Sequence, residues 1–88
     1  MFGVYVRVHI NDQQQAVDAL QNFVLPQVRQ MPGLVNGYWL HGDETTGVAL
    51  VVFQNREQAD AMVKMVEGGP GLAVTVETAS VHEITAHT

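Results

Sequence analysis

The fold is decided by the stretch Met31-Pro32-Gly33-Leu34-Val35-Asn36-Gly37-Tyr38-Trp39-Leu40. It begins as the end of an amphipathic helix, breaks at Pro32-Gly33 and restarts as a strand. Because side chains alternate along a strand, the neighbours Tyr38 and Trp39 are expected on opposite faces of the sheet. A sheet with large side chains on both faces must be covered on both sides, so this stretch concerns assembly as well as fold.

Apolar periodicity and turn residues predict four strands and two helices in the order βαββαβ. The predicted elements are, in order, a strand over 2–10, a helix from Asn11 or Asp12 to Met31, a strand over 34–41, a polar turn over 42–47, a strand over 48–53, a helix from Asn55 to Glu67, and a strand over 72–77 that resumes over 81–84 after a bulge. Asn55 and Gln58 have the spacing of a capping box, and Pro26 predicts a kink in the first helix. Gly68-Gly69-Pro70-Gly71 is expected to end the second helix.

Right-handed crossovers in this order give an α+β, ferredoxin-like fold. It has a four-stranded antiparallel sheet with both helices on one face and the first and third strands in the middle. The 88 residues are expected to form one domain. The third strand is apolar on both faces, so its face away from the helices needs a cover. A second copy of the sheet is the simplest cover, which predicts a homodimer through the sheet face.

Composition excludes several classes of partner. The formal net charge is -5, with four Lys and Arg residues and no cysteine. Without a basic stripe, neither nucleic-acid binding nor attachment to anionic membranes is expected. No apolar run reaches the ~20 residues of a membrane span, and residues 1–10 lack the basic start of a signal peptide, so the cytoplasm is the expected location. Only 15% of the residues are charged, which also favours a surface buried in an oligomer.

A set of residues spread over nearly the whole chain resembles one superfamily. The set comprises Leu20, Phe23, Val28, residues 32–39, the strand-to-cap transition Val51-Val52-Phe53-Gln54-Asn55, and Ala59. The chain is similar to the dimeric α/β-barrel superfamily and, within it, to the small antibiotic-biosynthesis-monooxygenase-like proteins. The resemblance implies a cofactor-independent monooxygenase-like or isomerase activity on a small hydrophobic or aromatic substrate. Two alternatives stay open: a non-catalytic homodimer that binds a small apolar ligand, and a structural module with no small-molecule activity.

The resemblance does not extend to haem degradation. Haem-degrading relatives carry an asparagine on the first strand and a histidine, the iron ligand, on the second helix. Here residues 2–10 contain no asparagine and residues 56–67 contain no histidine. No cofactor is therefore expected.

One candidate site lies on the mixed face of the predicted sheet. The side chains expected to share this face or its rim are Tyr5, Arg7, His9, Trp39 and His41. Such a group could hold an aromatic or phenolic substrate, with Arg7 stabilising an enolate by its charge and His9 transferring a proton. In the alternative, these side chains fill the space between two sheets, and Arg7 pairs with an acid such as Glu77.

A second candidate site lies between sheet and helices, where members of the superfamily commonly bind their substrates. Tyr38 is expected to point into it, and the other expected lining residues are Phe23, Val28, Met31, Met62 and Met65. An apolar pocket with adaptable methionines and one hydroxyl suits a hydrophobic ligand. In the alternative this space is solid core, closed by an apolar stripe of the first helix that consists of Ala16, Val17, Leu20, Phe23, Val24, Val28 and Met31.

Neither a metal site nor covalent catalysis is expected. His9 and His41 end the first and second strands, ~9–10 Å apart across the third, and His82 belongs to the other end of the sheet. Zinc needs three or four converging ligands, which one subunit does not provide. The chain has no cysteine and no serine or threonine with an evident histidine partner, so there is no activated nucleophile.

Overall fold

The computed structural model of the chain describes residues 1–68 and 73–88. Its elements are, in order, β1 (Phe2–Ile10), α1 (Gln13–Ala19), the π-helical turn η1 (Leu20–Val24), α2 (Leu25–Arg29), β2 (Leu34–Asp43), β3 (Thr46–Phe53), α3 (Arg56–Gly68) and β4 (Val74–Glu83). The strands form one antiparallel sheet in the order β2-β3-β1-β4. The predicted helix stop at Gly69-Pro70-Gly71 and the predicted strand start at Leu72 lie outside the described residues.

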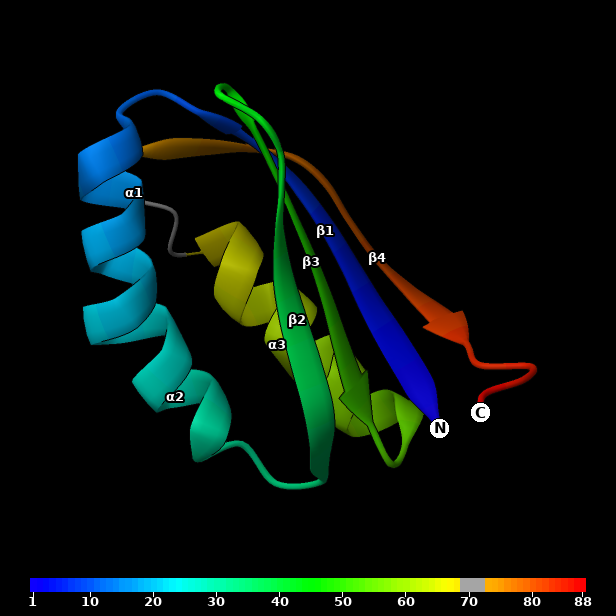
Figure 1. The fold of residues 1–88 in the computed structure, drawn as a ribbon. Helices are drawn as coiled ribbons and strands as arrows, with labels where there is room; N and C mark the ends of the chain where they lie inside the picture. Colours follow the sequence, from blue (N-terminus) through cyan, green and yellow to red (C-terminus); the bar gives the residue numbers. More distant parts are fainter. Residues whose placement is uncertain (69–72) are drawn as a thin grey trace.

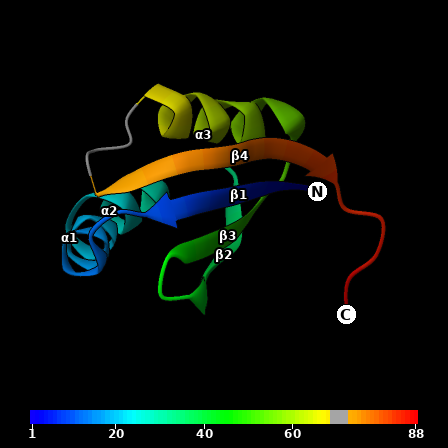
Figure 2. The same cartoon turned by 90° about the horizontal axis from the view of Figure 1, so that it is seen from above.

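Both helical segments lie on the same face of the sheet (Figure 1). Viewed from above, α3 runs along the strands, and α1 and α2 lie at one side (Figure 2). The predicted α+β, ferredoxin-like fold is thus confirmed, with the first and third strands in the middle. None of the helices in residues 1–68 and 73–88 is long and apolar enough to span a bilayer.

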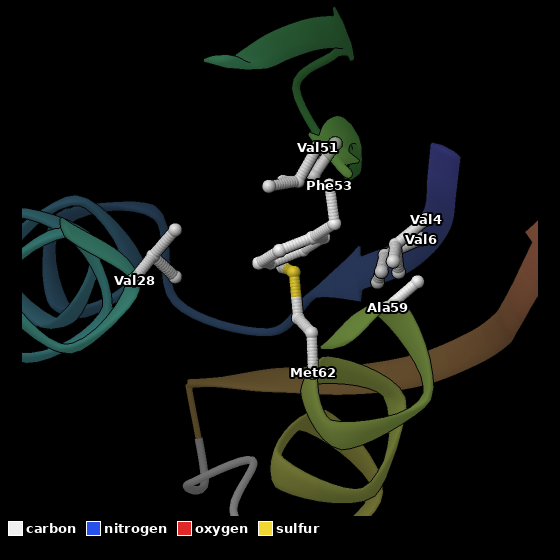
Figure 3. Packing of buried hydrophobic residues seen from close by; sticks show 8 residues of the cluster. Val4, Val6, Val28, Val51, Phe53, Ala59 and Met62 are labelled. Carbon is white, nitrogen blue, oxygen red and sulfur yellow. The ribbon is translucent and has the colours of Figure 1, made fainter. Parts of the chain in front are cut away.

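The core lies between α3 and the two central strands. Val4 pairs with Val51, and paired residues of antiparallel strands point to the same face. The buried cluster on this face consists of Val4, Val6, Val28, Ala49, Val51, Phe53, Ala59 and Met62. Figure 3 shows the side chain of Met62, from α3, against the ring of Phe53. The valine-rich side of β1 is therefore the helix-facing side, as its alternation predicts.

The start of α3 is fixed by the capping box that the sequence predicts. Asn55 Oδ1 accepts a hydrogen bond from Gln58 N at 3.0 Å, and Gln58 Oε1 accepts one from Asn55 N at 3.3 Å. The next turns bury Ala59 and Met62 against the sheet. Two donors at the helix start that would otherwise lack partners are thus satisfied reciprocally, which anchors α3 directly after β3.

The first helical segment is continuous over residues 13–29, within the predicted helix, but it contains a π-helical turn that the sequence does not predict. Asp12 caps it by accepting a hydrogen bond from Gln15 N at 3.0 Å. After α1 the chain widens into η1, where Leu25 N donates to Leu20 O, five residues back. Pro26 has no amide hydrogen, and in an α-helix its ring would clash with the preceding turn. The wider turn just before it accommodates the proline.

The predicted apolar stripe of this segment is buried at only one position. Val28 is buried, but Val17 and Phe23 are 42% and 67% exposed. The other members, Ala16, Leu20, Val24 and Met31, are half-buried. The prediction of a continuous buried stripe is wrong because the π-helical turn puts the positions before and after it out of phase.

Because of a β-bulge in β2, most side chains of that strand point to the sheet face opposite to the predicted one. Leu34 and Asn36 pair with two consecutive residues of β3, which leaves Val35 as an extra residue. The side chains of β2 from Asn36 to His41 therefore point to the face opposite to the one that simple alternation from Leu34 predicts, until a further register shift between His41 and Asp43.

The pairing of β4 with β1 also contains a bulge. Val76 and Thr78 pair with two consecutive residues of β1, which leaves Glu77 as the extra residue. The predicted bulge is thus present, but the predicted interruption at 78–80 is wrong, because those residues continue the pairing with β1.

The turn between β2 and β3 is held by Asp43. Its carboxylate accepts hydrogen bonds from Thr45 N at 2.8 Å and from Thr45 Oγ1 at 3.1 Å. These bonds stabilise the charged carboxylate and hold the pKa of Asp43 below its ordinary value. The bond from the Thr45 backbone N–H has the largest effect. The predicted hairpin is confirmed, although β3 already begins at Thr46.

Gly33 connects α2 to β2 in a conformation that favours glycine. Its φ is +78°, and a Cβ placed there would overlap the side-chain amide of Gln58. We expect Gly33→Ala to lower the free energy of unfolding by about 2 kcal/mol, because the change combines left-handed backbone strain with loss of the Gln58 cap. Chemical denaturation at fixed protein concentration measures this difference.

Gly68→Ala is the matched control for this prediction. Gly68 is the last residue of α3, and a Cβ there would meet no atom within 4 Å. The same substitution should change the free energy of unfolding by no more than about 0.5 kcal/mol. Equal losses at the two glycines would contradict the tight packing described for Gly33.

Candidate functional site

A crevice of about 250 Å³ lies between α2 and β2, on the helix-facing side of the sheet. Its walls are formed by Leu25, Val28, Arg29, Leu34, Gly37 and Trp39. Apart from Trp39 and Arg29, these residues are aliphatic or glycine. Small-molecule sites are commonly mostly apolar hollows with a few polar groups, and this one is slightly smaller than the usual ~300–1,000 Å³.

Trp39 reaches this crevice because of the bulge at Val35. It pairs with Ala49, a core residue, so both side chains point toward the helices. A Cβ placed on Gly37 would lie 3.0 Å from the Trp39 ring, which means that the indole covers this glycine. Gly37 therefore gives the ring room to lie close to the strand and form one wall of the crevice.

The helical wall of the crevice is one face of α2. Leu25, Val28 and Arg29 stand at positions i, i+3 and i+4, which neighbour one another on a helix. Arg29 and Leu25 are not among the predicted site residues, and the signal that could have identified them is this spacing, which places an arginine beside apolar residues. Val28 was correctly expected in this space.

The crevice exists because the two helical segments cover the sheet unequally. α3 buries Ala59 and Met62 against the strands, whereas the segment from α1 to α2 buries only Val28. Figure 2 shows α3 along the strands and α1 and α2 beside them. The expected pocket residues Met62 and Phe23 are accordingly elsewhere, Met62 in the core and Phe23 facing solvent.

The predicted mixed-face site is divided between two faces of the sheet. Tyr5, Arg7 and His9 lie on the face away from the helices, as their alternation predicts. The prediction that Trp39 and His41 join them is wrong, because the bulge turns both toward the helices. The five side chains do not form one site.

Tyr38 also lies on the sheet face opposite to the predicted one. It was expected to point toward the helices, but it pairs with Leu50 on the outer face and is 56% exposed. Leu50 pairs on its other side with Tyr5, so the two tyrosines flank this leucine. Tyr38 therefore belongs to the outer face and not to the crevice.

Arg7 lies next to Glu77, the acidic partner expected if these side chains fill the space between two sheets. Its Nε lies 4.0 Å from Glu77 Oε2, and both side chains are about half exposed, 51% and 43%. Glu77 can reach Arg7 because it is the extra residue of the β4 bulge. Exposed ion pairs at this distance contribute little to stability, typically about 0–1 kcal/mol.

His41 is on the same side of the sheet as the crevice. It follows Trp39 by two residues on one strand face, which corresponds to roughly 7 Å along the strand. The other histidines of the sheet, His9 and His82, lie on the outer face. His41 thus lies on the helix-facing side of β2, outside the residues that line the crevice.

Ser80 and His82 form a pair that contradicts one expectation. Ser80 Oγ lies 2.8 Å from His82 Nε2, so the expectation that no serine has a histidine partner is wrong. The signal was their spacing of two residues on one strand, which places both on one face. This pair lies on the outer face, outside the residues that line the crevice.

A larger groove, of about 560 Å³, runs along the edge strand β4 beside the end of α3. It is lined by Glu67 and residues 74–79, which include no aromatic ring and no cationic side chain. Within residues 1–68 and 73–88, no three His, Cys, Asp or Glu side chains come together to hold a metal ion. The crevice, with its indole and guanidinium groups, is therefore the candidate functional site.

Comparisons with known proteins support the fold. No family model and no curated protein sequence matches the chain. Among solved structures, SnoaB from Streptomyces nogalater, a cofactor-independent oxygenase, is similar with a TM-score of 0.70 and 11% identity over 98% of this chain and 94% of that one. A monooxygenase from the gene ActVA-Orf6 of Streptomyces coelicolor, solved with the ligand Nanaomycin D, is similar with a TM-score of 0.65 and 15% identity over 99% and 89%.

A third similar structure is a dimeric ferredoxin-like protein from an uncultured marine organism. Its TM-score is 0.67 and its identity 12%, over 99% of this chain and 97% of that one. Likenesses at such low identity concern the fold. The chain therefore has the subunit fold of the antibiotic-biosynthesis-monooxygenase-like, dimeric α/β-barrel proteins, as its resemblance to them implies.

Proposed function

We propose that the crevice between α2 and β2 binds a small hydrophobic or aromatic molecule. The observation that carries this proposal is the indole of Trp39, which forms one wall opposite an apolar helix face. An aromatic ring can stack on the indole or meet it edge-on, while the aliphatic walls remove its apolar surface from water.

The activity proposed at this site is a cofactor-independent, monooxygenase-like reaction. Its support is the likeness of the fold to SnoaB and to the Streptomyces coelicolor monooxygenase. A suitable substrate has a ring CH₂ acidic enough to lose a proton, with His41 as the acceptor and Arg29 beside the resulting anion. That anion reduces O₂: one oxygen atom stays in the product as a carbonyl, and the other leaves as water with the two hydrogens.

A second candidate function is ligand binding without turnover. The residues that line the crevice include no carboxylate and no imidazole, since His41 lies beyond Trp39. Catalysis by proton transfer needs an acid or base within hydrogen-bond reach of the ligand. A molecule confined to the crevice would meet none, which favours a binding protein for ligands that do not reach His41.

Replacement of Trp39 by leucine is expected to weaken binding of an anthrone or a quinone by about tenfold. The change removes the aromatic contact, worth roughly 0.5–1.5 kcal/mol, and part of the apolar wall. Calorimetric titration measures the affinity. An oxygen electrode, without added metal or cofactor, measures turnover on the same compounds, and mass spectrometry detects the added oxygen atom.

Phe23→Leu is the matched control, because Phe23 is 67% exposed and does not line the crevice. It should bind and turn over the test compounds as the unchanged protein does. Oxygen consumption that depends on Trp39 supports the oxygenase, and binding without consumption supports the second candidate. If no compound binds, or if Phe23→Leu weakens binding as much as Trp39→Leu, the crevice is not the site.

We also propose that the protein is a homodimer that joins through the outer face of the sheet. On that face Leu50 is 42% exposed, Tyr38 56% and Leu40 57%. Leu50 stands on a central strand between the two tyrosines with which it pairs, so the apolar surface lies at the middle of the sheet. A second copy related by a twofold axis would cover this surface with the same residues. The similar structure described as a dimeric ferredoxin-like protein supports a homodimer.

A further inference from the structure

Arg29 is the one ionic residue among those that line the crevice, and it is exposed to solvent. It stands in the last turn of α2, next to Leu25 and Val28 on the same helix face. In residues 1–68 and 73–88, the only ion pair within 4.0 Å joins Arg7 to Glu77. The Arg29 guanidinium therefore has no carboxylate partner in the described part of the chain.

A guanidinium group in an otherwise apolar wall has a clear chemical preference. It carries five N–H donors in a planar fork and accepts no hydrogen bond, so its best partner is a carboxylate held by two parallel bonds. The remaining walls offer an indole ring and aliphatic surface. An aromatic ring could thus lie against Trp39 while an acidic substituent at its edge meets Arg29.

We infer that the crevice selects an aromatic carboxylic acid, bound as its carboxylate by Arg29. This inference rests on the proposed function, because it names the class of ligand for the same site. The protein carries a net charge of -5, which disfavours anions in general. Selection for an anion would therefore depend on the local contact with Arg29.

Arg29 also has an ordinary structural explanation. A cation in the last turn of a helix interacts favourably with the negative end of the helix dipole. That role concerns stability and does not distinguish an anionic ligand from a neutral one. Ligand selectivity is therefore the measurement that separates the two explanations.

The test uses two probes of almost the same shape, 2-naphthoate and 2-acetylnaphthalene. Where 2-naphthoate has a negatively charged carboxylate oxygen, 2-acetylnaphthalene has a methyl group. Calorimetric titration at low salt should find 2-naphthoate bound about five- to tenfold more tightly, as expected for a partly exposed charge-assisted contact. Arg29→Gln should remove that preference and leave the affinity for 2-acetylnaphthalene within about twofold. Raising the salt concentration should weaken 2-naphthoate binding alone.

Lys64→Gln is the matched control, since Lys64 is an exposed cation of α3 outside the crevice wall and its loss changes the net charge equally. It should keep the preference for 2-naphthoate. If both probes bind equally, or if Arg29→Gln keeps the preference, the inference is overturned and the proposed crevice still stands. If neither probe binds, the proposed function fails, and the inference fails with it.

Discussion

Replacement of Phe53 by alanine is expected to lower the free energy of unfolding by about 3–5 kcal/mol. Phe53 is fully buried at the end of β3, and its ring lies against Met62 of α3 (Figure 3). Alanine would leave a cavity between sheet and helix that the neighbouring side chains can fill only in part. Small domains are typically stable by about 5–15 kcal/mol, so this single change removes a large share of the stability. Urea denaturation followed by circular dichroism measures it.

Phe23→Ala is the matched control for this prediction. The substitution is identical, but Phe23 is 67% exposed in η1. It should change the free energy of unfolding by no more than about 0.5 kcal/mol. A large loss at Phe23 would mean that the first helical segment packs on the sheet through its whole apolar stripe, which contradicts the structure described above.

Leu50→Asp is expected to dissociate the proposed homodimer. Leu50 lies at the middle of the outer face, and a twofold axis would bring the substitution into the interface twice. Two carboxylates would then lose water without gaining partners, which should raise the dissociation constant by at least about a hundredfold. Light scattering at micromolar concentration should change from twice the subunit mass of 9.6 kDa to that mass.

Val17→Asp controls for the general effect of an added carboxylate. Val17 is 42% exposed, like Leu50, but it lies on α1, on the opposite side of the sheet. It should leave the dimer intact. A monomeric unchanged protein would refute the proposed dimer, and dissociation by Val17→Asp would place the interface on the helices instead.

Topology and helix starts could be predicted because they depend on local signals. Asn55 and Gln58 are three residues apart, and each satisfies a backbone donor of the other, so the start of α3 follows from two residues. The order of the strands follows from short connections and the handedness of the crossovers. These features do not require knowledge of which side chains meet across the sheet.

The sheet face to which each side chain of β2 points could not be predicted in this way. The extra residue at Val35 arises from how β2 aligns with β3, and nothing in the local sequence marks it. Because of this one residue, Tyr38 lies on the outer face and Trp39 lines the crevice, which is the reverse of the prediction. The pair remains a sign of a sheet with large side chains on both faces.

The lining of the candidate site could be predicted only in part, for a related reason. The predicted stripe of the first helix assumes a constant helical period, but the π-helical turn shifts that period between α1 and α2. Only after this shift do Leu25, Val28 and Arg29 form the face that meets β2. A sequence pattern gives no account of a π-helical turn, although Pro26 marks where regular helical hydrogen bonding must change.

The most direct test of the proposed crevice is a nuclear magnetic resonance titration of ¹⁵N-labelled protein with 2-acetylnaphthalene. The chain has one tryptophan, so Trp39 gives a single indole N–H signal. Binding in the crevice predicts saturable shifts of this signal and of the amides of Gly37 and Val28. The amides of Tyr5 and Arg7, on the outer face, should remain in place. Shifts confined to the outer face, or no saturable shift of the Trp39 indole, would contradict the proposal.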